Sequence, residues 1–500
     1  MHGSASGEQP ALHGISPGKQ SAHNRAMFII LEVTQLRGKL GDYVTIGEMH
    51  TPLERLPAMK ATLLPVSFSS QPDDDFYHQL GKLRSLLEDE AEIMEPFPLG
   101  APAPSADAAL FPQMLGDAYR RLEDLQALMM PLLVVTSEFG TVSMWDWEIN
   151  GYLRLAGTHV IAPYSLEQTR KVCRSLGLKK ELAQSSLLVY QDNPGAGFQA
   201  EIFKRFYWWE DECTQRMLEK FGVTVIKKSF RELGEAARQV PEEDAEAAWS
   251  AWRERVPVGG ITRRALLSAV KLYLAVKHDL DEDSSVRAVG INCLNESHFS
   301  DTTPCLAWNM LYESEKKLWG CEADTVSMLT KVLLHETLGV PVMMTNLYPF
   351  LMGMAALKHE RIPHFPPVAD QPENHILAAH CGYLGVLPRS FSTGWTLRTR
   401  VLAIVDENAT AIDARLAQGP VTLAKLEPDF ASLSIVEGDL VGYAQFPGSD
   451  CLNGAVLRVS DGHRLMRELA SHHAILAAGH LKDDLEMVAP VFGLRVNVIG

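Results

Sequence analysis

The feature that most constrains the fold of this chain is the stretch of sequence at 322–346. Its apolar residues recur at helical spacing over 323–338, Gly339 ends that pattern, and a short apolar run follows at 340–345. Another apolar run, AVGIN at 288–292, precedes it and is typical of a buried strand. We therefore predict a β-α-β unit of a parallel sheet, in which ligands gather beyond the carboxyl ends of the strands. The polar residues expected near such ends are Asn292, Glu322 and Asn346.

Composition indicates a multidomain globular protein. The chain has 500 residues, 46% of them hydrophobic, which is enough for cores in about three domains. Its formal net charge of −16 should repel phosphate backbones, so nucleic acid is not an expected partner. The longest apolar runs are shorter than the roughly 18 residues of a membrane span, so we expect no membrane association. Seven cysteines without a CxxC pair favour a cytoplasmic location.

Alternating strand and helix patterns predict an α/β fold before about residue 355. Residues 95–109, rich in Pro and Ala, are expected to form a surface loop. Ser229 and Glu232 form an S-x-x-E signature that predicts the start of a helix. The strands expected in this part lie at 28–34, 131–137, 158–163, 185–190 and 222–228.

The pattern changes in the last part of the chain, where short strands alternate with Gly, Asp or Asn turns. We therefore predict an α/β protein of two Rossmann-like α/β domains followed by a β-barrel C-terminal domain. The late strands are expected at 396–408, 419–429, 432–445 and 454–462. The predicted division is a flexible leader at 1–26, an N-terminal α/β domain at 27–170, a second α/β domain at 171–355 and a β-rich domain at 356–500.

Histidines near the end of the chain are candidate metal ligands. The segment SHHAILAAGH at 471–480 contains His472, His473 and His480. Neutral imidazole is a common metal ligand, and a hard-metal site needs a carboxylate or amide oxygen as well. Adjacent histidines also occur at ordinary surface or core positions, so the pattern alone leaves both interpretations open.

Aromatic residues give a separate indication of a carbohydrate ligand. Trp145 and Trp147 alternate with acidic residues soon after the strand at 131–137, and Trp395 stands in the polar segment 392–396. Sugar rings present C–H faces to aromatic rings and hydroxyls to carboxylates and amides. Trp145 and Trp147 fit a plain core position equally well, which makes Trp395 the stronger candidate.

The order and spacing of several motifs resemble the L-fucose isomerase family and its relative, L-arabinose isomerase. The similarity extends over roughly residues 130–500. It implies two N-terminal α/β domains, a C-terminal β-barrel domain, and interconversion of aldoses and ketoses with a divalent ion, commonly Mn²⁺. The motifs are the 288–346 segment, HCG at 380–382, VTLAKL at 421–426, SIVEGD at 434–439, Cys451 and the terminal HHAILAAGH.

This resemblance assigns roles to individual residues. Glu322 matches a metal-binding carboxylate that also exchanges a proton with the sugar, and either His472 or His473 matches the metal-binding histidine. Asn346 stands where the family has a second metal-binding aspartate. An asparagine amide still gives one oxygen to a metal, but it accepts no proton and carries no negative charge.

Proton transfer in such a site would need Glu322 and a partner such as Asp324, His380 or a water molecule. Three interpretations follow. The chain is a metal-dependent isomerase acting through an enediol, an enzyme of the same fold with different sugar chemistry (epimerase, lyase or hydrolase), or a non-catalytic sugar-binding protein. Residues expected to contact the carbohydrate are Asn292, His380, Trp395 and Trp145.

The resemblance also implies a closed homo-oligomer, a hexamer, in which the first α/β domain of a neighbouring subunit completes each cleft. The segment at 145–150 is our candidate for that contribution.

Overall fold

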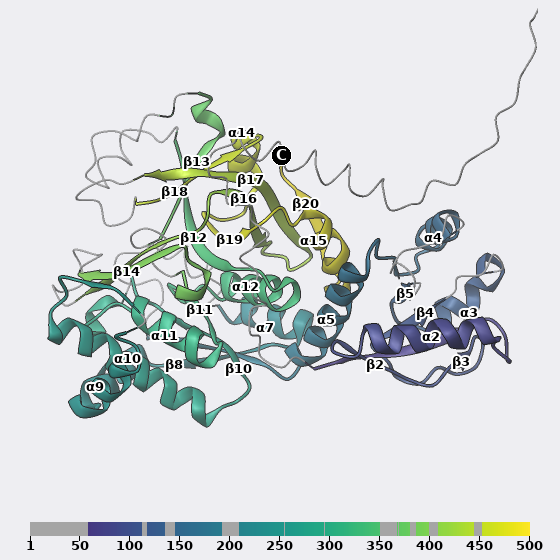
Figure 1. Cartoon of the computed structure of the whole chain (residues 1–500), viewed down its shortest axis with the longest axis horizontal. Coiled ribbons are helices and arrows are strands. Elements are labelled where there is room, and N and C mark those ends of the chain that lie inside the picture. The colour runs from purple at the N-terminus through teal and green to yellow at the C-terminus, as the bar shows by residue number, and fades with distance from the viewer. Residues whose placement is uncertain are drawn as a thin grey trace, which may run out of the picture. The chain divides into compact units, whose positions relative to one another are not determined.

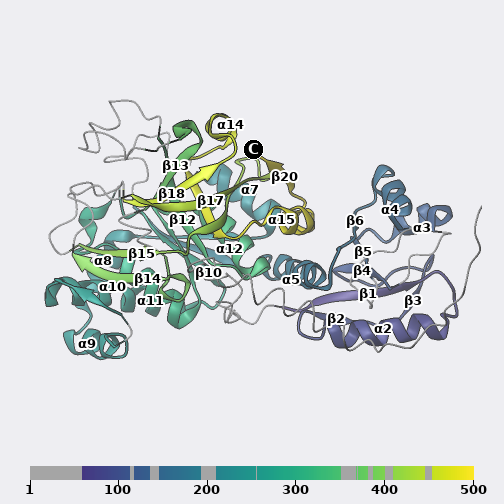
Figure 2. The ribbon, with the colours of Figure 1, turned by 45° about the horizontal axis from the view of Figure 1, so that its top comes forward.

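The computed structural model describes residues 59–112, 118–135, 146–192, 210–254, 256–294, 296–350, 368, 370–380, 387–399, 409–444 and 453–500. These residues form two parallel sheets, a three-stranded sheet and a closed β-barrel (Figures 1 and 2). The expected mixed α/β fold with a barrel near the C-terminus is thereby confirmed. The strand predicted at 28–34 and the candidate Trp145 lie outside the described residues.

The first sheet is parallel, with the strand order β2-β1-β4-β5-β6 and with β3 paired to β1. The strands predicted at 131–137 and 158–163 are confirmed as β5 and β6. The surface loop predicted at 95–109 is wrong in part, because β3 and the start of β4 lie within it. The strands are β1 (Ala61–Ser67), β2 (Ala91–Ile93), β3 (Phe97–Pro98), β4 (Ala108–Phe111), β5 (Leu132–Val134) and β6 (Val160–Ile161).

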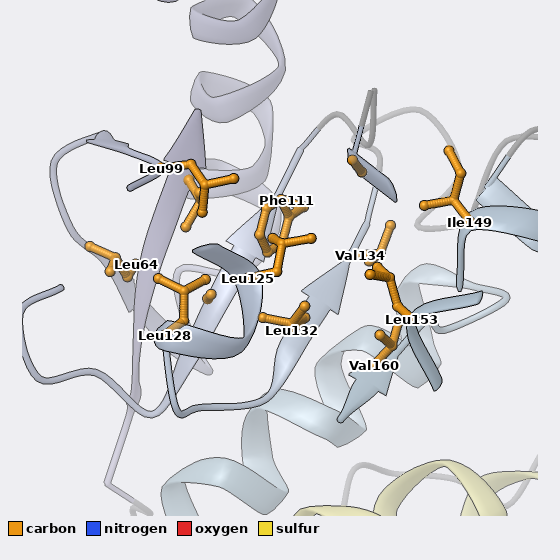
Figure 3. Close-up of a cluster of buried hydrophobic side chains, with 13 residues drawn as sticks. Leu64, Leu99, Phe111, Leu125, Leu128, Leu132, Val134, Ile149, Leu153 and Val160 are labelled. Carbon is orange, nitrogen blue, oxygen red and sulfur yellow. The ribbon is translucent and has the colours of Figure 1, made fainter. Parts of the chain in front are cut away.

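An apolar cluster forms the core between this sheet and helices α3 (Leu122–Ala127) and α4 (Asp146–Leu155) (Figure 3). Leu125 and Leu153, one from each helix, lie in the cluster beside side chains of the strands. A fully buried side chain of this size contributes about 1.5–3 kcal/mol relative to an exposed one. The strand residues of the cluster include Leu64, Val66, Phe111, Leu132, Val134 and Val160. The other helices of this part are α2 (Asp74–Leu86) and α5 (Leu166–Leu182).

The second sheet is also parallel, with the order β11-β10-β7-β8. The strands predicted at 185–190 and 222–228 are confirmed as β7 (Ser186–Tyr190) and β8 (Thr224–Lys228). The predicted cap is confirmed too, because Ser229 Oγ accepts a hydrogen bond of 3.1 Å from Glu232 N at the start of α8. The remaining elements are β10 (Val286–Ile291), β11 (Leu318–Cys321), α7 (Asp211–Phe221), α8 (Phe230–Gln239), α9 (Glu242–Ser250), α10 (Arg263–Glu282) and α11 (Cys305–Glu315).

The predicted β-α-β unit is wrong in its second strand. The parallel neighbours of β10 in the second sheet are β7 and β11, and the sequence pattern did not reveal β11. The apolar run at 340–345 instead begins β12 (Val342–Pro349), which pairs antiparallel with two strands of the barrel. Because β12 continues to Pro349, Asn346 lies within this strand rather than at its end.

The barrel closes through six strands in the order β16-β19-β12-β13-β18-β17, with β17 pairing back to β16. β17 also carries β20 as a parallel neighbour. The predicted strands at 419–429, 432–445 and 454–462 are confirmed as β16, β17 and β18. The bounds are β13 (His375–Ala379), β16 (Gly419–Leu426), β17 (Ser432–Ala444), β18 (Gly454–Val459), β19 (His473–Ala478) and β20 (Arg495–Val498), with helices α14 (Gly462–Glu468) and α15 (Lys482–Val488).

Helix α12 (Thr325–Leu338) joins the second sheet to the barrel (Figure 1). It contacts β10 and β11 on the sheet side and β12, β16 and β19 on the barrel side. All of its residues are buried, so the helix is covered on every side, and its polar side chains, such as Ser327 and Lys331, are hydrogen-bonded inside the protein. Asp324 caps its first turn, and Gly339, in the left-handed conformation, ends it as predicted.

A three-stranded sheet separate from the barrel contains β9 (Val258–Gly259), β14 (Gly394–Thr399) and β15 (Thr410–Arg415). The strand predicted at 396–408 is confirmed over residues 396–399, as part of β14, and its residues 400–408 lie outside the described ranges. The strand β15 was not predicted. No helix in the described ranges is both long enough and apolar enough to pass through a membrane.

Close strand packing at the start of β18 predicts a large effect of one small substitution. A Cβ atom at Gly454 would stand 2.2 Å from the carbonyl oxygen of Ala378 in the neighbouring β13. We expect Gly454→Ala to destabilise the protein by about 1–3 kcal/mol, because the barrel backbone would have to move. Gly442→Ala in β17 is the matched control, since no atom lies within 4 Å of the position that its Cβ would take. Equal denaturant midpoints for the two variants would contradict this.

Candidate functional site

Several of the residues singled out from the sequence come together where β11 leads into α12 beside one end of the barrel. Glu322 and Asp324 lie in the turn between those two elements. In the barrel, Asn346 of β12 pairs with His473 of β19 on one side and with Ala379 of β13 on the other. His380 directly follows that strand. The barrel thus places His473, Asn346 and His380 at the same end of three adjacent strands, the last of them just past β13.

The turn that carries Glu322 has an unusual backbone. Glu322 and Ala323 have φ angles of 55° and 52°, a left-handed conformation that costs a non-glycine residue about 1–3 kcal/mol. Ala323 N donates to Ile291 O at 3.0 Å, and Asp324 N donates to Cys321 O at 3.1 Å. These bonds hold the turn against the end of the second sheet. Two consecutive strained residues at a buried carboxylate are typical of a functional turn.

His473 lies between the two carboxylates of this turn. Its Nδ1 donates to Asp324 Oδ2 at 2.9 Å, and its Nε2 lies 3.6 Å from Glu322 Oε1. The His473 ring is completely buried. Of the two histidines left open by the sequence, His473 is therefore the one that faces Glu322. The side chain of His472 is exposed, and its carbonyl oxygen accepts a bond from Leu347 N.

His380 and Asn346 form the second part of the site. His380 Nδ1 donates to Asn346 Oδ1 at 3.2 Å, which leaves the lone pair on the other ring nitrogen, Nε2. That Nε2 is buried and has no hydrogen-bond partner in the described part of the chain. Asn346 itself is half-buried. His380 is thus held as a neutral ring with an available acceptor nitrogen.

Charges around the site separate the protonation states of these groups. Burial opposes ionisation of Glu322, but His473, His380 and His472 together lower its pKa to about 2. Burial lowers the pKa of His380 to about 4, despite the nearby Glu322. Burial also disfavours the cationic form of His473, yet Glu322 and Asp324 raise its pKa. At neutral pH the site therefore holds an ionised Glu322 beside a neutral His380.

Asp324 is not available as the proton-transfer partner that the sequence left open. Its Oδ2 accepts from Lys425 Nζ at 3.0 Å and from Ser327 Oγ at 2.8 Å, besides His473. Its Oδ1 accepts from Ser327 N at 2.8 Å. Burial opposes the charge on Asp324, but Lys425 and His473 hold its pKa well below the usual range. This carboxylate orients its neighbours, so His380 is the better partner for Glu322.

The donor set fits a divalent ion bound by few protein ligands. In the described residues no three His, Cys, Asp or Glu side chains are grouped closely enough to hold a metal by themselves. Glu322 and His473 offer a carboxylate and an imidazole, and Asn346 adds an amide oxygen. Hydrogen bonding of His473 Nδ1 to a carboxylate is the usual support of a metal-binding histidine. Oxygen and imidazole donors together suit ions such as Mn²⁺.

Asn292 is placed close to this turn. It follows β10, and the next residue, Cys293, accepts a bond of 3.4 Å from Glu322 N through its Sγ. The Asn292 side chain is fully buried, and both atoms of its amide lack hydrogen-bond partners among the described residues. A buried amide of this kind is a ready donor and acceptor for a polar ligand.

Trp395 does not lie in a polar loop, and that prediction is wrong. It belongs to β14, is 4% exposed, and its Nε1 donates to Asn309 Oδ1 and Leu387 O at 3.1 and 3.2 Å. Its polar sequence neighbours alternate with it across the strand, so the ring is part of the core. Trp145 lies outside the described residues, whereas Trp147 on α4 is exposed.

Sequence reasoning missed Lys425 and Ser327. Lys425 stands in the otherwise apolar VTLAKL run, and a lysine in a buried strand was the signal that could have identified it. Ser327 stands three residues after Asp324, the spacing of a helix cap.

A cavity of about 650 Å³ lies at the other end of the barrel, beside Asp439, Arg458 and His480. In its lining Arg458 bonds to Asp439 at 3.0 Å and His480 donates to Gly438 O at 3.1 Å. His480 is thereby separated from His473 by the length of β19. The end of the barrel beside Glu322 has the strained turn, the two buried carboxylates and the unpartnered amide and ring atoms of Asn292 and His380. We therefore take that end as the functional one.

Comparison of the sequence with models of protein families gave no match, and comparison with curated proteins gave none either.

Proposed function

We propose that this protein is a metal-dependent sugar isomerase of the L-fucose isomerase type, which interconverts an aldose and a ketose through an enediol. The observation that carries the proposal is the row Asp324–His473–Glu322 beside the pair His380–Asn346. It combines an ionised carboxylate, a neutral buried imidazole and metal-type donors in one place. These are the groups that proton transfer next to a carbonyl requires.

Glu322, His473 and Asn346 would hold the ion, which when bound supplies Lewis acidity to the carbonyl and adjacent hydroxyl of the sugar. The Glu322 carboxylate accepts the proton from the carbon beside the carbonyl and returns it to the neighbouring carbon. Its low pKa keeps it ionised and ready to accept. His380 Nε2 accepts the hydroxyl proton and gives it to the former carbonyl oxygen, so protons balance over the reaction.

The proposed function also includes a class for the two α/β parts of the fold. We assign the two parallel sheets to Rossmann-like domains, an assignment supported in the second sheet by the reversal of strand order between β7 and β10. Asn292 follows β10 at that point and would contact the sugar.

We further propose a cytoplasmic homo-oligomer, a hexamer by resemblance. Helix α4 supports an assembly contact in this part of the chain, because it exposes Trp147 and Leu155 to solvent. This helix includes residues 146–150 of the predicted contact segment.

Asn346→Asp should tighten Mn²⁺ binding. A carboxylate adds a full negative charge at a half-buried position, where the effective dielectric is lower than in water. We expect the dissociation constant, measured by calorimetric titration, to fall by about tenfold or more, on the order of 1.4 kcal/mol. Asn374→Asp, an asparagine remote from Glu322 beside the cavity at the other end of the barrel, is the control. Unchanged affinity in Asn346→Asp would mean that Asn346 is not a ligand.

A further inference from the structure

Lys425 is a buried cation with a defined set of partners. It stands near the end of β16, and its Nζ donates to Asp324 Oδ2 at 3.0 Å and to Ser327 Oγ at 2.7 Å. The side chains of Lys425 and Asp324 are 2% and 0% exposed. The next residue, Leu426, donates its backbone N–H to Thr330 Oγ1 in α12. β16 and the first turns of α12 are thus joined by polar bonds between buried side chains.

Stability alone gives little reason for a lysine here. Removing two charges from water is costly, and well-packed apolar residues often replace a buried ion pair without loss of stability. The neighbouring strand residues, such as Leu423 and Ala424, are apolar and equally buried. A methionine or leucine would continue that pattern, so the lysine points to a role in arranging its partners.

The partners of Asp324 show what that role is. Lys425, Ser327 and His473 all donate to the same oxygen, Oδ2, while Ser327 N donates to Oδ1. The Asp324 carboxylate therefore has a single orientation that satisfies all its donors. Because His473 Nδ1 must donate to it, the Nε2 atom of the same ring is directed to Glu322.

We infer that Lys425 is a positioning residue, which fixes the Asp324 carboxylate and through it the tautomer and ring orientation of His473. The consequence for metal binding rests on the proposed function, whereas the consequence for the His473 ring does not. Without Lys425, Asp324 loses the cation at its Oδ2 and keeps only the two bonds from Ser327, so its hold on His473 weakens. Outer partners of metal-binding histidines typically contribute about 10–100-fold to metal affinity.

The test uses Lys425→Met, Lys425→Arg and the matched control Lys331→Met in the full-length protein. Lys331 is also a completely buried lysine of the same region, but its Nζ donates to Trp319 O and touches neither Asp324 nor His473. Calorimetric Mn²⁺ titration should show a dissociation constant about 10–100 times higher for Lys425→Met. Lys425→Arg, which keeps the cation, should recover part of that loss, and Lys331→Met should bind as the parent does.

A second readout is independent of any metal. In the metal-free parent labelled with ¹⁵N-histidine, at an alkaline pH that leaves the ring neutral, His473 should show a protonated Nδ1 and an unprotonated Nε2, with its signals assigned through His473→Gln. Lys425→Met should show a mixture of tautomers at His473. If this variant does not fold, Lys425→Gln, which keeps one donor for Asp324, replaces it with the same expected direction.

A parent-like His473 tautomer together with parent-like Mn²⁺ affinity in Lys425→Met would overturn the inference. A parent that binds no Mn²⁺ would overturn the proposed function instead, and the ¹⁵N signals would still decide whether Lys425 positions His473.

Discussion

Glu322→Gln is expected to abolish Mn²⁺ binding at micromolar concentrations and to lower aldose–ketose isomerisation by about 10²–10⁴-fold. The substitution keeps the size of the side chain but removes its charge and its ability to accept a proton. Because the pKa of Glu322 is about 2, the parent carboxylate is ionised at every pH at which the protein would be assayed. The loss should therefore be nearly independent of pH.

The control for this substitution is Glu336→Gln. Glu336 is also buried, but it lies near the far end of α12 from Glu322. Calorimetric Mn²⁺ titration and a ketose assay on both variants separate loss of the site from general damage to the fold. Equal Mn²⁺ affinity in Glu322→Gln and in the parent would show that Glu322 binds no metal.

Lys331→Met is expected to change how stability depends on pH. Burial lowers the pKa of the Lys331 ammonium to about 7 in the folded protein, from 10.5 in the unfolded chain. Between these values the unfolded chain binds a proton that the folded protein does not, so the Lys331 contribution to stability rises with pH. One proton contributes about 1.4 kcal/mol per pH unit, or about 4 kcal/mol between pH 7 and pH 10.

Lys331→Met lacks this contribution, whereas other groups titrate equally in parent and variant. Urea unfolding at pH 7 and pH 10 should therefore show the parent gaining about 4 kcal/mol relative to Lys331→Met over that range. The same comparison for the exposed Lys227→Met serves as the reference. A constant difference between parent and Lys331→Met at both pH values would show that Lys331 keeps its proton in the folded protein.

Local patterns were sufficient to predict much of the fold. Helix α12, its stop at Gly339 and the Ser229 cap follow from spacing and capping residues within a few positions of one another. The barrel strands β16 to β18 were visible because short apolar runs alternate with turns. Each of these features is encoded within a short segment of chain.

Pairing between distant segments was not predictable in the same way. The apolar run at 340–345 reads equally well as a parallel strand of the second sheet or as a barrel strand. Its barrel partner β19 lies far along the sequence, and only the tertiary fold brings the two strands together. The four-residue β11 was missed because it leads into the turn at Glu322 without a separating loop.

The candidate site shows the same division. Glu322, Asn346 and the histidine pair were recognised through motif resemblance, but the choice of His473 over His472 required the burial of its ring. The role of Asp324 depends on Lys425, which lies about a hundred residues away on another element. Trp395 was predicted to lie in a loop because its sequence neighbours are polar, but it belongs to the strand β14.

Metal-dependent isomerisation by this protein is tested most directly by measuring Mn²⁺ binding and ketose formation on the same purified sample. The protein, loaded with Mn²⁺, is incubated with L-fucose, L-arabinose and D-arabinose, before and after removal of the metal with a chelator. We expect stoichiometric Mn²⁺ binding and a ketose product from at least one of these sugars, lost with the metal. Absence of bound Mn²⁺ and of any ketose product would contradict the proposed function and favour a sugar-binding protein without this activity.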